Sequence, residues 1–131
     1  MTEPKICPFC TFGPAHVILA NDDAFAIYDG FPLTAGHMLI LPKRHIASLF
    51  EATQEERNAL FDLLGEAREG VQEEFGPDGF NIGINDGPAA GQTVMHLHIH
   101  LIPRYLGDVP DPRGGVRWIF PEKAVYWKGT S

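Results

Sequence analysis

Hydrophobic and polar positions alternate in five short stretches of the chain, and this alternation predicts five β-strands. The first two stretches are 16–20 and 25–29. The three polar residues between them, 21–23, favour a turn, so we expect a hairpin. The other strands are expected at 36–42, which Pro42 closes, at 80–84, and at 94–102, which Pro103 breaks.

A helical period over 53–75 predicts one long helix. Thr53 and Glu56 have the spacing of a capping box, and Gly76-Pro77 would end the helix. Its acidic positions are expected to lie on a solvated face. The apolar positions that would form the buried face are Leu60, Leu63, Leu64, Ala67, Val71 and Phe75.

These elements predict an α+β domain with a mostly antiparallel five-stranded sheet and one long helix. Because 131 residues are typical of one domain, we expect a single domain over 1–131 with a core at about 7–104. Residues 105–131 are rich in proline and glycine and contain both tryptophans. We expect them to form a C-terminal tail that covers part of the core or reaches a partner.

Composition and charge narrow the possible functions. The formal net charge of −7 would repel a long phosphate polymer, so binding to DNA or RNA is not expected. No apolar run approaches the roughly 18 residues of a membrane span, and no secretory signal pattern is visible. We therefore expect a cytoplasmic protein without a membrane partner. Only two cysteines are present, which is not a secreted disulfide framework.

Three of the six histidines alternate with apolar residues near the end of the predicted fifth strand. Alternate side chains of a strand share a face, so His96, His98 and His100 (the triad) are expected to point the same way. The simplest alternative is a half-buried strand with a polar outer face. Two chemical alternatives remain open: three imidazoles that bind zinc and activate water, or a neutral imidazole that attacks phosphorus.

The run 96–102 resembles the motif of the histidine triad (HIT) family, in which histidines and apolar residues alternate. The preceding run 86–94 and the pair Pro103-Arg104 are similar to the branch that contains the fragile-histidine-triad dinucleoside polyphosphate hydrolases. The stretches 36–40 and 42–45 fit the upstream part of the family. The resemblance extends from about residue 7 to residue 104.

The resemblance implies a HIT-like fold and a catalytic role for each histidine of the triad. His98 would attack the α-phosphate of a nucleotide and become nucleotidylated, and His100 would hydrogen-bond the phosphate or the leaving group. Each further candidate has a structural alternative as a turn, strand-start or core residue. The residues implied to contact substrate are Asp29, His37, Asn85, Gln92 and Thr93.

The same resemblance implies a structural zinc site. Several bacterial members of the family place zinc on two such cysteines, a downstream histidine and the first histidine of the triad. The corresponding residues here are Cys7, Cys10, His45 and His96. Two thiolates and two imidazoles form a common tetrahedral zinc set. The alternative is a reduced, metal-free cysteine pair.

The implied activity is hydrolysis or transfer at the α-phosphate of dinucleoside polyphosphates, nucleoside phosphoramidates or adenosine phosphosulfate, with no catalytic cofactor. The loop sequence slightly favours dinucleoside polyphosphates. A homodimer with joined sheets is also implied. Two alternatives stay open: a nucleotide-binding regulatory protein with little turnover, and the zinc-activated hydrolase. Arg113, Arg117 and Lys123 of the tail would either offset the net charge near phosphate or lie solvated.

Overall fold

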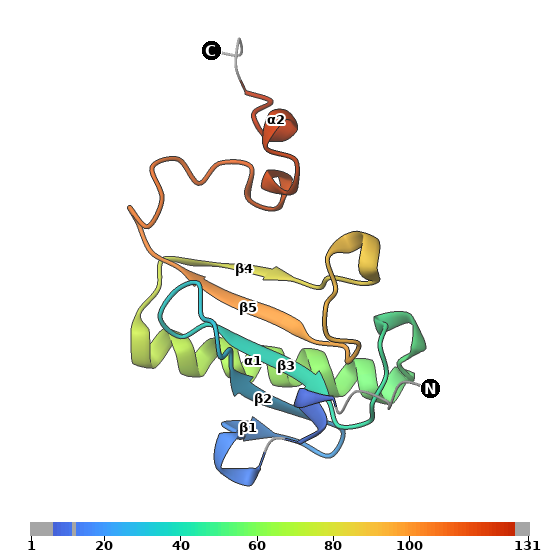
Figure 1. The fold of residues 1–131 in the computed structure, drawn as a ribbon. Coiled ribbons are helices and arrows are strands. Elements are labelled where there is room, and N and C mark those ends of the chain that lie inside the picture. Colours follow the sequence, from blue (N-terminus) through green and yellow to red (C-terminus); the bar gives the residue numbers. More distant parts are fainter. Residues whose placement is uncertain (1–6, 12, 128–131) are drawn as a thin grey trace.

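The computed structural model describes residues 7–11 and 13–127, which form an antiparallel sheet with strand order β1-β2-β3-β5-β4 and one long helix (Figure 1). The predicted α+β class is therefore confirmed. The elements are β1 (Leu19–Ala20), β2 (Ala24–Tyr28), β3 (Met38–Pro42), α1 (Gln54–Phe75), β4 (Gly79–Gly83), β5 (Ile99–Arg104) and α2 (Pro121–Ala124).

Within the described residues, five short 3₁₀-helices lie before or between these elements. Among the described residues, none of the helices combines the length and the apolar character needed to cross a bilayer. The 3₁₀-helices are η1 (Pro8–Cys10), η2 (Pro14–His16), η3 (Leu49–Glu51), η4 (Pro88–Ala90) and η5 (Gly115–Ile119).

The last strand differs from the prediction at both ends. It begins at Ile99, five residues later than expected, because the Leu97 N–H donates to the Ile46 carbonyl instead of joining the sheet. Pro103 lies inside the strand and does not break it. β3 pairs with β5 only as far as Leu101, so at Pro103 only β4 flanks the strand and the missing N–H is tolerated.

The first strand is also shorter than predicted, because His16 belongs to η2 and β1 covers only 19–20. The hairpin itself is confirmed. The Asn21 side-chain oxygen accepts hydrogen bonds from the N–H groups of Asp23 and Ala24, which fixes the turn between β1 and β2.

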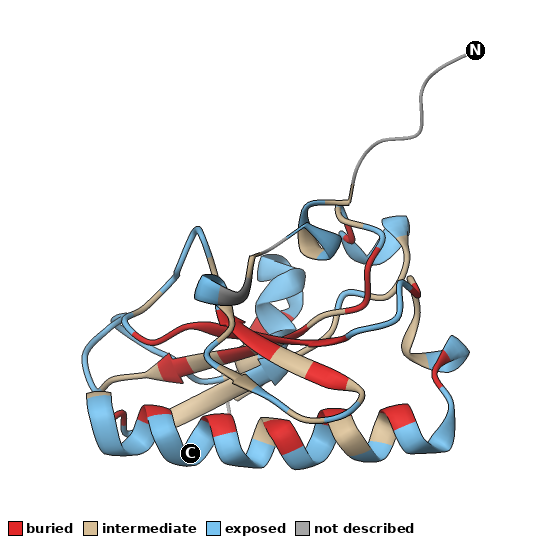
Figure 2. Ribbon diagram, turned by 90° about the horizontal axis from the view of Figure 1, so that it is seen from below, coloured by how far each residue is buried: buried red, intermediate tan, exposed pale blue. Residues whose placement is uncertain are grey.

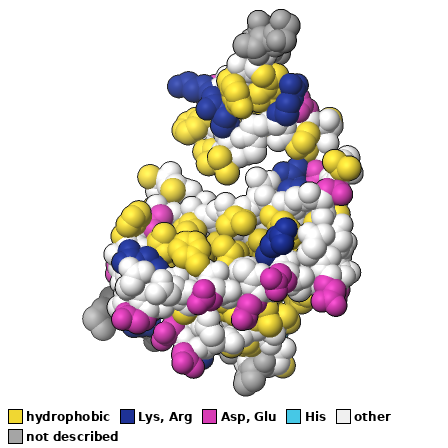
Figure 3. Space-filling view, turned by 180° about the vertical axis from the view of Figure 1, so that it is seen from behind, with side chains coloured by type: hydrophobic (Ala, Val, Ile, Leu, Met, Phe, Trp, Pro, Cys, Tyr) yellow, Lys and Arg dark blue, Asp and Glu magenta, His cyan; other side chains and the backbone are white. Residues whose placement is uncertain are grey.

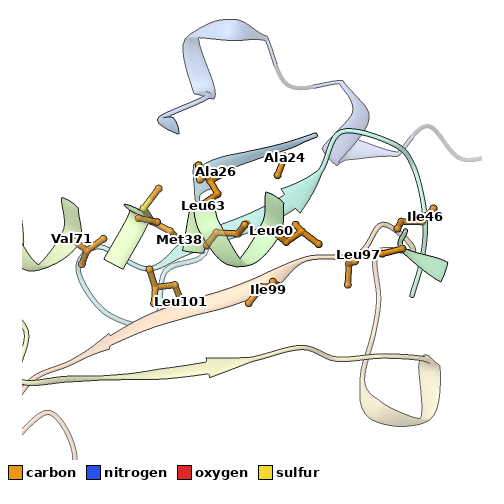
Figure 4. Packing of buried hydrophobic residues seen from close by; sticks show 13 residues of the cluster. Ala24, Ala26, Met38, Ile46, Leu60, Leu63, Val71, Leu97, Ile99 and Leu101 are labelled. Atoms are coloured by element: carbon orange, nitrogen blue, oxygen red, sulfur yellow. The ribbon is translucent and has the colours of Figure 1, made fainter. Parts of the chain in front are cut away.

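The main core lies between α1 and one face of the sheet, and the buried positions of α1 face the strands (Figure 2). β3 and β5 contribute alternate residues to it, and Met38 and Leu101 are paired across the two strands (Figure 4). The predicted buried face of the helix is confirmed, with Leu64 and Phe75 partly buried. The fully buried members on α1 are Leu60, Leu63, Ala67 and Val71.

A smaller apolar cluster covers part of the opposite face of the sheet. Ile27, Leu39 and Leu41 are buried there, and Phe9 and Phe25 pack against them. Leu39 is paired with His100 across β3 and β5. The face that carries the histidines is therefore the face that η1 partly covers.

The start of α1 confirms the predicted capping box. The Thr53 side chain accepts from the Glu56 N–H, and the Glu56 carboxylate accepts from the Thr53 N–H. Glu56 is buried, which corrects the expectation that all acidic positions of the helix lie on a solvated face. Arg44 donates to both Glu56 oxygens, at 3.0 and 2.8 Å, and this ion pair explains the burial.

We expect Glu56→Gln to make stability less dependent on acid pH. The Arg44 hydrogen bonds lower the pKa of Glu56 from 4.5 to about 2, so the ionised carboxylate stabilises the fold above pH 4.5. This contribution is lost as the pH falls towards 2. Because Arg44 is 55% exposed, solvent weakens the pair, and we expect a loss of about 1 kcal/mol at pH 7. Urea unfolding of wild type and Glu56→Gln between pH 7 and pH 2 measures this loss of stability. A difference between the two proteins that does not change with pH would contradict the role of the ionised Glu56 carboxylate.

The tail folds back on itself around Ala124, which is fully buried. In the space-filling view, hydrophobic side chains and Lys and Arg side chains gather in a lobe at the top of the molecule, and a hollow lies between this lobe and the body below it (Figure 3). Arg117 donates to the carbonyls of Lys123 and Ala124, and its guanidinium lies over the Tyr126 ring. Arg113 pairs with Asp111. These two arginines therefore hold the tail together.

Candidate functional site

The triad lies on the face of the sheet opposite α1. Leu97, Ile99 and Leu101 enter the main core, whereas the alternate histidines turn the other way. The ring centroids of His98 and His100 are 5.1 Å apart, and His37 lies 5.2 Å beyond His100. The predicted shared face thus persists, although the sheet ladder begins only at Ile99.

A backbone hydrogen bond orients His98. Its Nδ1 lies 2.8 Å from the His96 carbonyl oxygen. A carbonyl can only accept, so Nδ1 carries the proton. In the neutral ring the lone pair is then on Nε2. The side chain is partly exposed, and His98 is not among the residues that line the large cavity beside His100. Nε2 is therefore the ring nitrogen whose lone pair is not used by the backbone hydrogen bond.

A directed chain of hydrogen bonds orients His100. The Leu33 N–H donates to His37 Nδ1 at 3.1 Å, so the neutral His37 ring carries its proton on Nε2. That Nε2 lies 3.0 Å from His100 Nδ1, which accepts. The proton of a neutral His100 ring is then on Nε2. His100 is therefore set up as a donor beside His98.

Burial and Asp29 act in opposite directions on these rings. Burial lowers the pKa of both His37 and His100, and the Asp29 carboxylate partly offsets this. Asp29 Oδ2 lies 3.4 Å from His37 Nε2 and 3.8 Å from His100 Nδ1. Burial is the larger effect, so the neutral forms required by the hydrogen-bond chain are favoured.

We expect His37→Leu to lower kcat by about 10- to 100-fold, because His100 loses the donor that fixes its tautomer. The fold should survive, since the change is to an apolar side chain of similar length. Steady-state kinetics and a thermal unfolding curve measure the two effects. Wild-type kcat in a folded variant would show that His37 has no part in orienting His100.

Hydrogen bonds from the Gln92 side chain hold the loop before the triad in place. The Gln92 side chain is buried, and its amide donates to the carbonyls of Ala47 and Val94. Its oxygen accepts from the Gly87 N–H at 2.8 Å. The Gln92 amide is thus engaged with backbone, which does not fit the implied phosphate contact. It fits a role in shaping the loop.

Asn85 and Thr93 are both exposed. Asn85 lines a cavity of about 1020 Å³ together with Asp29, His37 and His100. The structure therefore brings together most of the predicted substrate-binding residues. Thr93 does not line this cavity.

The far wall of this cavity comes from the tail, with Val116, Trp118 and Ile119 of η5. Within the described residues, Arg104 is the only lysine or arginine that lines it. Asp108 accepts from Arg104 at 2.7 and 2.8 Å, so this charge is neutralised. The lining also includes Asp29, Asp108 and Asp111. Asp108 and Asp111 are paired with Arg104 and Arg113, respectively. Sequence reasoning missed the wall that the tail forms, because no local pattern places the tail beside His100.

Cys7, Cys10, His45 and His96 form a second group of ligand atoms, the cysteine–histidine cluster, all within 4.8 Å of one another. The sulfur–nitrogen distances are 3.5, 3.2 and 3.4 Å. Bond lengths of about 2.3 Å to sulfur and 2.0 Å to nitrogen in a tetrahedron give an edge of roughly 3.5 Å. The cluster thus has the dimensions of a tetrahedral metal site.

His96 has the tautomer that a metal ligand needs. Its Nε2 lies 2.8 Å from the Pro42 carbonyl oxygen and donates to it, so the Nδ1 lone pair faces the two sulfurs. Burial is the main effect that lowers the pKa of His96, which keeps the ring neutral. Burial and Cys7 raise the pKa of the Cys10 thiol, so metal binding would release its proton.

Asp29, His37 and His100 also lie close enough to hold a metal ion. Their hydrogen bonds argue against it, because His37 receives the Leu33 N–H at Nδ1 and carries its proton on Nε2, the atom that would be the ligand. Within the described part of the chain, the ring nitrogens of His96, His98 and His100 do not all lie within 4.8 Å of one another, the spacing that defines the two groups above. The geometry therefore disfavours a zinc-activated triad.

Comparison of the sequence with known proteins identifies relatives of this chain. Residues 12–107 match the profile of the HIT domain. The chain is 35% identical over 103 residues to Protein hit of Bacillus subtilis, which covers 76% of this chain and 71% of that protein. It is 37% identical over 98 residues to a bis(5'-adenosyl)-triphosphatase of Dictyostelium discoideum, covering 71% of this chain and 66% of that protein.

A solved structure supports the same comparison. The crystal structure of a zinc-bound histidine triad family protein from Mycobacterium smegmatis superimposes with a TM-score of 0.71 and 35% sequence identity. The match covers 80% of this chain and 84% of that protein.

Proposed function

This chain belongs to the HIT domain family, and from that premise we propose that it is a nucleotide hydrolase or transferase that acts through a nucleotidyl-histidine intermediate. The observation that carries the proposal is the hydrogen bond from His98 Nδ1 to the His96 carbonyl. It leaves the Nε2 lone pair available beside the donor His100. Curated relatives with hydrolase names include the triphosphatase described above.

The proposed reaction is a double displacement at the α-phosphate. His98 Nε2 forms a bond to phosphorus while the bond from phosphorus to the leaving group breaks. His100 Nε2–H donates to the leaving atom or to a phosphate oxygen, which stabilises the developing charge. Water or another acceptor then displaces His98 and releases the nucleoside monophosphate or its derivative.

The remaining predicted residues have supporting roles in this proposal. Asp29 would accept from the ribose hydroxyls, since its carboxylate lines the cavity beside His37. Asn85 and Thr93 would contact phosphate oxygens. Gln92 would shape the loop instead of contacting substrate.

We propose that the cysteine–histidine cluster holds a structural zinc ion, as its tetrahedral dimensions and the His96 tautomer support. When bound, zinc would cross-link η1 to the segment before β5 without activating water, because four protein ligands close the site. A homodimer is proposed through β4, an edge strand with Ile82 half exposed.

The cavity lining supports one substrate class over another. Asp108 pairs with Arg104 and Asp111 pairs with Arg113, so among the described lining residues Asp29 is the one carboxylate without an arginine or lysine partner. The lining therefore offers no unpaired cation to a polyphosphate leaving group, whereas an amine or another uncharged leaving group needs none. We expect kcat/KM for adenosine phosphoramidate to exceed that for diadenosine triphosphate by about tenfold at low salt, with the ratio shrinking as salt screens the Asp29 carboxylate. Parallel kinetics at two salt concentrations measure this. A preference for the triphosphate at low salt would contradict it.

Intact-mass spectrometry tests the intermediate itself. The protein is mixed with either substrate and quenched in base within seconds, since base preserves a phosphorus–nitrogen bond better than acid. An added adenylyl mass that is absent from His98→Ala supports the proposal. The proposal would be rejected if wild type hydrolysed the substrate without forming an adduct and His98→Ala kept full activity. Tight nucleotide binding with neither adduct nor hydrolysis would favour a regulatory nucleotide-binding protein.

A further inference from the structure

The ring of Phe9 lies against the ring of His98. Their centroids are 5.0 Å apart with an interplanar angle of 73°, an edge-to-face contact. The centroid of Phe9 also lies 6.1 Å from that of His96, at 80°. Sequence reasoning assigned Phe9 no role, and its only signal is its place between the two cysteines.

Phe9 packs onto a buried apolar floor. Ile27, Leu39 and Leu41 form this floor on β2 and β3, and each is at most 3% exposed. Because these residues belong to paired strands, the floor is rigid. The sheet therefore positions Phe9 through this floor, and the Phe9 ring makes an edge-to-face contact with the His98 ring.

The cysteine–histidine cluster fixes both ends of the segment that carries Phe9. Cys7 Sγ lies 3.5 Å from His96 Nδ1, and Cys10 Sγ lies 3.2 Å from His45 Nδ1. Only Pro8 and Phe9 separate the two cysteines, and Pro8 has a fixed φ angle. A metal held by these four ligands would leave Phe9 little freedom to move.

His98 needs a second constraint besides its hydrogen bond. The bond from Nδ1 to the His96 carbonyl sets the tautomer, but one hydrogen bond does not by itself prevent the ring from tilting about it. The rings of His100 and Phe9 both contact the His98 ring, at centroid distances of 5.1 and 5.0 Å. The Phe9 edge meets the ring and limits this tilt. In-line attack requires the Nε2 lone pair to point at phosphorus, so tilt affects the rate directly.

We propose that Phe9 is a positioning residue for His98, and that the cysteine–histidine cluster, with its metal bound, holds Phe9 in place. This inference rests on the proposed role of His98 as the nucleophile. Phe9 acts through the orientation of His98, so its replacement lowers kcat and leaves KM nearly unchanged.

Kinetics of three variants test the positioning role. Phe9→Leu removes the ring edge, Phe9→Tyr retains it, and Phe50→Leu is a control for an exposed ring on η3. We expect kcat to fall about 10- to 100-fold in Phe9→Leu, with KM within about twofold, and to recover in Phe9→Tyr. An unchanged kcat, or a change in KM alone, overturns the proposal.

A spectroscopic readout tests the anchoring without any turnover. Histidine-labelled protein is compared by ¹⁵N NMR with zinc bound, after chelation, and as zinc-treated Cys10→Ser. We expect the zinc-bound protein to show the Nδ1–H tautomer of His98 and a nuclear Overhauser contact between the Phe9 and His98 rings, and the other two samples to lose this contact.

The outcomes separate this inference from the proposed function. A contact that persists after chelation overturns anchoring by the metal, and a contact absent from the zinc-bound protein overturns the positioning role. The amide spectrum of a second, uniformly ¹⁵N-labelled preparation of each sample, unchanged for α1, verifies that the protein is folded. If the proposed function is wrong, His98→Ala will retain full turnover or wild type will show none. The NMR spectra can still be interpreted in either case.

Discussion

Replacing His98 by alanine should reduce turnover by at least about 10³-fold, because the variant lacks the atom that we propose bonds to phosphorus. The expected loss is in kcat and in the adenylyl adduct together. Nucleotide binding should persist, since Asp29, Asn85 and the cavity walls remain. Single-turnover kinetics combined with intact mass measure both effects.

The control is His16→Ala. His16 belongs to η2 and is exposed, so this change has the same chemistry at a position outside the proposed site. It should leave kcat within about twofold of wild type. Thermal unfolding of both variants should resemble that of wild type, because His98 is only partly buried. Substantial activity in His98→Ala would mean that another group, or an activated water, attacks the phosphate.

In Cys10→Ala, the stability of the protein should no longer depend on zinc. We expect the free energy of unfolding in the presence of zinc to fall by about 2–4 kcal/mol, since three remaining ligands bind the ion weakly and ligand binding to the native state is what stabilises it. The melting temperature should drop by about 10 °C. Differential scanning calorimetry with zinc and with a chelator measures this.

Comparison of the two conditions supplies the internal control. A chelator should lower the melting temperature of wild type and leave that of Cys10→Ala almost unchanged. Equal melting temperatures for wild type in zinc and in chelator would contradict a structural metal. A bound metal content of one ion per chain, lost in the variant, would identify the site directly.

Local patterns predicted much of this architecture. The alternation of apolar residues and histidines in 96–101 specified which side chains enter the core, and it persists where the backbone leaves the sheet ladder. The capping box of Thr53 and Glu56 likewise depends on neighbours in sequence. Such features need no knowledge of the rest of the fold, because the period of the element determines them.

Features that depend on distant segments were not predictable. The Glu56 burial requires Arg44, and the Gln92 hydrogen bonds require the carbonyl of Ala47, 45 positions away. The end of β5 depends on where β3 stops pairing with it. The contact between Phe9 and His98 joins η1 to the segment just before β5, and nothing in the composition of either segment indicates it.

The order of the ligands along the chain has a consequence for biosynthesis. Cys10 precedes His45 by 35 residues and His96 by 86. At about 5–20 residues per second, a ribosome completes the last ligand several seconds after the thiols. The thiols would therefore lack a full ligand set until residue 96 has been made. Loading of the proposed metal would follow the emergence of the triad, and the nascent chain would be most vulnerable to oxidation before that moment.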